Sequence, residues 1–146
     1  GQVWGTAYGS INSPVVFTSY VESKFIEAEA HLRKTTPDQS AADGAYRDAV
    51  QASLAKFDVS NANWEALYAN NKFIPVTLED IAVAKYTALF LQAEAYTNFR
   101  RTGYPALTPV SGFEIPSRLP YPTDERLYNV ANRPSVTIFT KMGWMP

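Results

Sequence analysis

The longest uninterrupted helical pattern in the chain lies within residues 77–105. Thr77 stands three residues before Asp80, which is the spacing of a capping box, so we expect the helix to begin at Leu78. Apolar residues then recur at helical spacing on two sides of the segment. Because a helix that is apolar on two sides packs between neighbours, the pattern predicts one long buried helix.

The end of this helix is marked as clearly as its start. Arg100 and Arg101 place positive charge near the negative end of the helix dipole. Gly103 can adopt the left-handed conformation that ends many helices, and Pro105 cannot continue a helix. The sequence therefore predicts that the helix stops just before Gly103.

Two further helices are predicted upstream. Ser19 lies three residues before Glu22, and Ser40 lies three residues before Asp43, so each pair predicts a capping box at a helix start. These helices end near residues 34 and 57, and each carries apolar residues on one face. A turn of only a few residues joins them, so they must lie antiparallel as a hairpin, which is similar to one tetratricopeptide unit.

Shorter elements are expected in the remaining segments. The pattern indicates a short helix over about 62–69, another over about 124–131 capped by Thr123, and strand propensity at 136–139. Five prolines within 105–122 predict an extended segment that wraps over the helices. The predicted fold is therefore all-α, with a tetratricopeptide-like hairpin, a long buried helix and a proline-rich C-terminal segment in a single domain over 1–146.

Charge and composition exclude several function classes. The formal net charge is −1, and no basic run exceeds one arginine pair, so a nucleic-acid interface is not expected. The chain has no cysteine, which excludes disulfides, thiolate metal sites and a lipidated cysteine within these residues. Charged residues make up 18%, against roughly 25% in ordinary domains. Together with many aromatic residues, this predicts apolar surface that meets something else.

Candidate catalytic residues do not assemble into a known constellation. His31 is the only histidine, so a zinc site with two histidines cannot form and a Ser-His-Asp triad would have to use this residue. We favour a structural role for His31 on its helix. The glycines are scattered rather than clustered as in a phosphate-binding loop, so no cofactor is expected.

Carboxylates and aromatic residues offer the remaining chemistry. A carboxylate pair for glycoside hydrolysis could come from either of two predicted helices, and helix capping or ion pairing is the competing interpretation that we favour. The candidate carboxylates are Glu22, Glu27, Glu29, Glu79, Asp80 and Glu94. Arg100 or Arg101 could clamp a carboxylate, although a structural salt bridge is the commoner role. Trp4 and Tyr8 could stack on a sugar ring, but aromatic anchors that pin a loop to the core are the favoured interpretation.

Three sequence motifs carry a resemblance to a known family. They are EAEA at 27–30, RRTGYPAL at 100–107 and IPSRLPYP at 115–122. Together with SYVE at 19–22, they resemble the SusD/RagB family and are most similar to its SusD-like group. Val21 and Ser19 stand where that family usually has Ala and Thr.

The resemblance implies a non-catalytic, mostly helical protein with tetratricopeptide-like helix pairs. Such proteins are outward-facing outer-membrane lipoproteins of Bacteroidetes, which capture an oligosaccharide or another nutrient and pass it to a TonB-dependent, SusC-like transporter. Because members have several hundred residues and an N-terminal lipid anchor, we expect residues 1–146 to be the C-terminal part of a larger protein. No binding residue is carried over from the family. The alternative is a helical-repeat interaction module without a sugar ligand.

Overall fold

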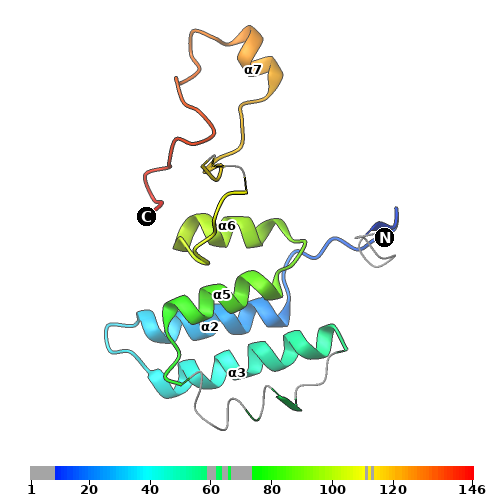
Figure 1. The fold of residues 1–146 in the computed structure, drawn as a ribbon, viewed down its shortest axis with the longest axis vertical. Helices are drawn as coiled ribbons and strands as arrows, with labels where there is room; N and C mark the ends of the chain where they lie inside the picture. Colours follow the sequence, from blue (N-terminus) through cyan, green and yellow to red (C-terminus); the bar gives the residue numbers. More distant parts are fainter. Residues whose placement is uncertain (1–8, 59–61, 64–65, 67–73, 111, 113) are drawn as a thin grey trace.

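The computed structural model describes residues 9–58, 62–63, 66, 74–110, 112 and 114–146. Within these ranges the chain is helical and contains no strand, so the predicted all-α class is confirmed (Figure 1). The helices are α2 (Tyr20–Arg33), α3 (Gln39–Lys56), α5 (Leu78–Ala88), α6 (Ala93–Thr102) and α7 (Thr123–Tyr128). The short helix predicted over 62–69 falls largely outside the described residues.

Helices α2 and α3 form the predicted antiparallel hairpin (Figure 1). The Ser19 hydroxyl accepts a hydrogen bond from the Glu22 backbone N–H at 3.2 Å and so begins α2. Phe25 and Tyr46 meet edge to face with their ring centroids 6.0 Å apart. Ala28 is fully buried, which lets the two helices approach closely. The resemblance of this hairpin to a tetratricopeptide unit stays a prediction.

The predicted capping box at Ser40 and Asp43 is wrong. Asp38 caps α3 instead, since its carboxylate accepts a hydrogen bond from the Ala41 N–H at 3.1 Å. The Asp43 carboxylate accepts from the backbone N–H of Val76 at 2.9 Å, and Gln39 donates both to Asp43 and to the Val76 carbonyl. Asp43 therefore fastens the hairpin to the segment that enters α5, a role that local spacing does not reveal.

Helix α5 completes a three-helix core on the hairpin. The capping box of Thr77 and Asp80 is confirmed in both directions, and the helix begins at Leu78 as predicted. Val76 and Ile81 lie on either side of this cap and are buried together with residues of α2 and α3. The core is therefore built from the hairpin and the first half of the central pattern.

The single long helix predicted over residues 78–102 is wrong, because the chain breaks after Ala88 and turns back. Figure 1 shows α6 returning alongside α5. Leu91 occupies the left-handed region with φ of 65°, which costs roughly 1–2 kcal/mol for a residue with a Cβ. The turn buries Leu89 to 1% exposure and brings the Asn98 amide within 3.5 Å of the Ala82 carbonyl. Packing between the two short helices thus outweighs the local helical preference.

The proline-rich segment follows α6 and extends away from the other helices (Figure 1). The Tyr96 hydroxyl donates to the Pro116 carbonyl at 2.6 Å, and the Arg100 guanidinium lies 5.5 Å from the Trp144 ring. The prediction that the segment wraps over the helices therefore holds only at α6. Helix α7 is shorter than predicted and has no side-chain cap from Thr123.

Residues 136–139 form no strand. The Ile138 carbonyl accepts hydrogen bonds from the N–H groups of Ser117 and Arg118 at 2.8 and 3.2 Å, which joins the two arms of the C-terminal segment. No helix in the described ranges is both long and apolar enough to cross a membrane.

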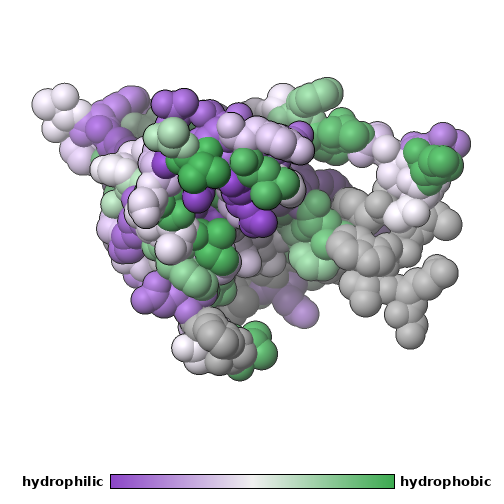
Figure 2. Space-filling model, turned by 90° about the horizontal axis from the view of Figure 1, so that it is seen from above, coloured by the Kyte–Doolittle hydropathy of each residue, from purple (hydrophilic) through white to green (hydrophobic). Residues whose placement is uncertain are grey.

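Apolar side chains remain on the surface, as the composition predicts. Phe17 is 94% exposed and Val15 is 80% exposed, and several residues of the C-terminal segment are also accessible. Figure 2, seen from the end of the molecule that carries this segment, shows hydrophobic side chains in separate groups among hydrophilic ones. These groups are surfaces on which a ligand or a partner can pack.

Two glycines test the local backbone argument with opposite signs. Gly103 ends α6 at φ of 75°, and a Cβ there would also lie 3.4 Å from Pro146. Gly103→Ala should therefore lower the free energy of unfolding by about 1–2 kcal/mol. Gly44→Ala, within α3 and facing open space, should raise it by about 0.5–1 kcal/mol. Urea denaturation measures the free energy of unfolding of both variants. Destabilisation by both substitutions would contradict the placement of Gly44 within α3 with open space around it.

Candidate functional site

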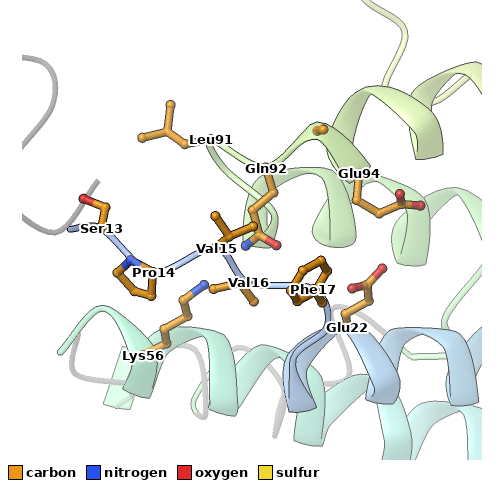
Figure 3. Close-up of a pocket in the computed structure, with 11 residues that line it drawn as sticks. Ser13, Pro14, Val15, Val16, Phe17, Glu22, Lys56, Leu91, Gln92 and Glu94 are labelled. Carbon is orange, nitrogen blue, oxygen red and sulfur yellow. The ribbon is translucent and has the colours of Figure 1, made fainter. Parts of the chain in front are cut away.

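A cavity of about 730 Å³ opens between residues 13–17 and the junction of α5 with α6. Figure 3 shows the 13–17 segment crossing between α3 and this junction. The lining residues are Ser13, Pro14, Val15, Val16, Phe17, Glu22, Lys56, Leu91, Gln92, Ala93 and Glu94. We call this space the junction cavity.

The break between α5 and α6 positions one wall of the junction cavity. Leu91 in its left-handed conformation redirects the chain, and Gln92 then stands at the N-terminal boundary of α6. Glu94 follows in the first turn of that helix, where the helix dipole favours a carboxylate. The second wall comes from α2 and α3, through Glu22 near the start of one helix and Lys56 at the end of the other.

The junction cavity combines an apolar floor with a few polar groups, which is the usual makeup of a small-molecule site. The exposed Phe17 ring offers a flat apolar face, and Figure 3 shows it beside the Glu22 carboxylate. The Gln92 amide and the Glu94 carboxylate add a donor and acceptors suited to hydroxyl groups. This combination fits a polyhydroxylated ligand with an apolar ring face.

The structure brings two of the candidate carboxylates, Glu22 and Glu94, to the same cavity. Glu22 does not close a capping box as predicted. Its carboxylate instead pairs with Lys85, the two atoms lying 3.4 Å apart with both side chains largely buried. A carboxylate held by a buried cation has a structural role. Glu22 and Glu94 therefore do not form the pair of independent carboxyls that a glycosidase uses.

The other candidate carboxylates do not line the junction cavity. Asp80 completes the α5 capping box, and Glu27 pairs with Lys24 at 2.9 Å. Glu79 is exposed in the first turn of α5. Within the described residues, no cluster of three or more acidic or histidine side chains could hold a metal ion.

Glu29 and Arg101 join α2 to α6 in a polar network. Arg101 donates two hydrogen bonds to the Glu29 carboxylate at 2.6 and 2.7 Å and a third to the Asn98 side chain at 2.9 Å. Arg33 also donates to Glu29 at 2.7 Å. The structural interpretation of Arg101 is thus confirmed, and a bidentate pair fixes orientation as well as distance. We call this group the α2–α6 clamp.

Charge pairing in the clamp shifts two pKa values. Burial acts to raise the pKa of Glu29, but the hydrogen bonds from Arg101 and Arg33 outweigh burial and hold it below its usual range. The hydrogen bonds to Glu29 raise the pKa of Arg101. Both groups therefore remain charged at neutral pH.

The remaining predicted site residues lie apart from the junction cavity. His31 Nδ1 lies 2.9 Å from Lys34 Nζ and 4.0 Å from the Asp38 carboxylate, at the turn of the hairpin, which agrees with a structural role. Arg100 stacks on the Tyr96 ring at 4.7 Å. Trp4 and Tyr8 lie outside the described residues.

Sequence reasoning missed the residues that distinguish the junction cavity. Phe17 lies in a segment of no regular period, three residues before the first residue of α2. Gln92 lies at the start of α6, where the sequence pattern predicts no helix boundary. Lys56 ends α3, whose end the pattern places only approximately, near residue 57. A partial signal existed, because an aromatic residue and two valines in a segment rich in Ser and Asn are unusual for a solvated loop.

The lowered pKa of Glu29 predicts a pH-dependent effect of Glu29→Gln. The carboxylate stabilises the fold fully above the ordinary Glu pKa of about 4.3 and loses that contribution as pH falls through the lower folded value. At pH 7 the variant should lose about 1–2 kcal/mol of unfolding free energy. The difference from the parent should shrink below about pH 4, as measured by urea denaturation across pH.

Glu114→Gln supplies the control, because Glu114 is an exposed carboxylate outside the clamp. It should unfold like the parent at every pH. A Glu29→Gln deficit that stays constant down to pH 3 would show that charge pairing does not stabilise α6.

Comparison with known proteins identifies the family. A SusD-like family model, described as starch-binding associating with outer membrane, matches residues 3–122. Searches of curated proteins and of solved structures gave no match. The matched range contains α2, α3, α5 and α6 and the α2–α6 clamp. It also contains every residue that lines the junction cavity. The chain therefore belongs to the SusD-like family.

Proposed function

We propose that this chain is part of a non-catalytic glycan-binding component of an outer-membrane nutrient-uptake system. The observation that carries the proposal is the family match over residues 3–122, whose description is starch-binding associating with outer membrane. The placement of the motif residues supports it, because Arg101 and Gly103 hold and end α6 rather than lining a reactive site. The protein binds its ligand without turning it over.

The junction cavity is the proposed glycan contact within this chain. A pyranose ring presents C–H groups that pack on a flat aromatic face, and Phe17 offers such a face. Sugar hydroxyls can donate to the Glu94 carboxylate and accept from the Gln92 amide. The apolar surface of residues 14–16 then borders the bound ring.

The proposed setting is the outward face of the outer membrane. The whole protein is a lipoprotein whose anchor lies outside residues 1–146, and this chain forms its C-terminal part. A TonB-dependent, SusC-like transporter beneath it receives the captured oligosaccharide. The family description, with its outer-membrane association, supports this arrangement.

A protein-interaction module without a sugar ligand is the second candidate. The observation that favours it is the run of exposed apolar side chains at Ile11, Val15 and Phe17, since such patches mark protein interfaces as well as ligand sites. The two functions differ in what Phe17 contacts. A glycan contact makes sugar affinity depend on this ring, whereas a protein contact does not.

Phe17→Ala should weaken binding of a malto-oligosaccharide about fivefold to tenfold, because the ring's stacking face is lost. Isothermal titration of the purified chain measures the dissociation constant. Phe17 is almost fully exposed, so the substitution leaves the core intact. Tyr128→Ala is the matched control, because it removes another exposed aromatic ring far along the chain in α7. Equal affinities of Phe17→Ala and the parent would exclude the junction cavity as the sugar site.

The proposed absence of catalysis has its own test. Incubation of the chain with malto-oligosaccharide should release no reducing ends, and Glu94→Gln should leave that result unchanged. Turnover that disappears in Glu94→Gln would establish a glycosidase instead.

Affinity purification of the whole protein from its outer membrane should bring down a TonB-dependent transporter. Recovery of soluble proteins alone would favour the interaction module.

A further inference from the structure

A second cavity, of about 220 Å³, lies within the C-terminal segment, apart from the junction cavity. Arg118, Arg126 and Arg133 all line it, and they come from the IPSRLPYP motif, from α7 and from the loop that follows. Tyr121 and apolar side chains such as Leu119 complete its walls. No acidic residue is among the lining residues. We call this space the arginine cavity.

The frame of the arginine cavity is closed by backbone hydrogen bonds. The Ile138 carbonyl accepts from the N–H groups of Ser117 and Arg118, so the two ends of the loop between these residues are held together. The Arg118 guanidinium lies 5.6 Å from the centre of the Tyr121 ring, a cation–π contact. A guanidinium stacked in this way keeps the N–H groups at its edge available for a ligand.

The three guanidinium groups lack compensating negative charge in the described chain. None of the three makes an ion pair with another described residue. The Nε atom of Arg133 is buried without a hydrogen-bond partner in that same part of the chain. Like charges around one cavity repel, and a buried donor without an acceptor is unfavourable. A bound anion would offset both effects.

We propose that the arginine cavity binds the carboxylate or sulfate group of an acidic sugar in an oligosaccharide, an inference that rests on the proposed glycan-binding function. Guanidinium groups bind such planar or tetrahedral oxyanions through paired hydrogen bonds. The volume lies below the roughly 300 Å³ at which drug-sized pockets begin, so it suits one charged sugar ring rather than a chain. The Tyr121 ring can pack on the sugar's C–H face.

The two cavities would then recognise different parts of a glycan. The junction cavity is lined by charges of both signs, since Glu94 and the Lys85-paired Glu22 stand beside Lys56, whereas the charged residues that line the arginine cavity are all arginines. Neutral and acidic saccharides should therefore bind to separate places on the chain. Substitutions in one cavity should leave the other ligand's affinity unchanged.

Titration with acidic oligosaccharides tests the inference. The full chain is titrated at low ionic strength with an oligogalacturonate, which carries carboxylates, and separately with a chondroitin sulfate oligosaccharide, which adds sulfate. Arg126 is exposed, so Arg126→Gln removes a guanidinium without disturbing the core, and it should weaken binding about tenfold or more. Arg126→Lys keeps the charge but loses the paired donors, and it should fall between the parent and Arg126→Gln.

Lys141→Gln is the matched control. It removes one positive charge from an exposed residue of the same segment that does not line the arginine cavity, and it should bind like the parent. Tighter binding of the chondroitin sulfate oligosaccharide than of the oligogalacturonate by the parent would show that added sulfate strengthens binding. Equal weakening by Lys141→Gln would reveal only general charge attraction and would overturn the inference.

Three further outcomes separate the two levels of the argument. Binding of malto-oligosaccharide without binding of either acid overturns the arginine cavity as a sugar site and leaves the proposed function in place. Tighter binding of a polyglutamate peptide than of either acid overturns the sugar assignment and favours an acidic protein partner. No binding of any saccharide overturns both proposals.

Discussion

The arrangement of this chain depends on the ion pair between Glu29 of α2 and Arg101 of α6, residues 72 positions apart in sequence. Helix α6 contributes little to the apolar core, and Asn98 is its one residue among those described as buried. Its position therefore depends on polar contacts, in which Arg101 reaches Glu29 and Asn98 reaches the Ala82 carbonyl. Paired hydrogen bonds between a guanidinium and a carboxylate fix orientation as well as distance, so they favour one placement of α6.

Helix α6 lines the junction cavity and also contacts the C-terminal segment in which the arginine cavity lies. On one side, the return of α6 along α5 sets Gln92 and Glu94 opposite the 13–17 segment and so forms the junction cavity (Figure 3). On the other side, Tyr96 and Arg100 hold the C-terminal segment through Pro116 and Trp144. The RRTGYP motif thus supplies structural support. This use of motif residues agrees with a family that binds ligands rather than transforms them.

Much of the fold could be predicted from the sequence because local rules agree with the packing there. Ser19 and Thr77 begin helices as their spacing predicts, and Gly103 ends one in the left-handed conformation. The break at Leu91 could not be predicted, because neither glycine nor proline marks it and only contacts between α5 and α6 favour it. The clamp and the cavities likewise join residues from distant segments, which local periodicity does not relate. The Lys85 pairing of Glu22 was missed for the same reason.

A double-mutant cycle between Glu29 and Arg101 tests the central claim most directly. The free energies of unfolding at pH 7 are compared for the parent, Glu29→Gln, Arg101→Gln and the double variant. If the ion pair holds α6 in place, the sum of the losses of unfolding free energy in the two single variants should exceed the loss in the double variant by about 1 kcal/mol or more. Additive losses, within about 0.3 kcal/mol, would mean that α6 is positioned by something else.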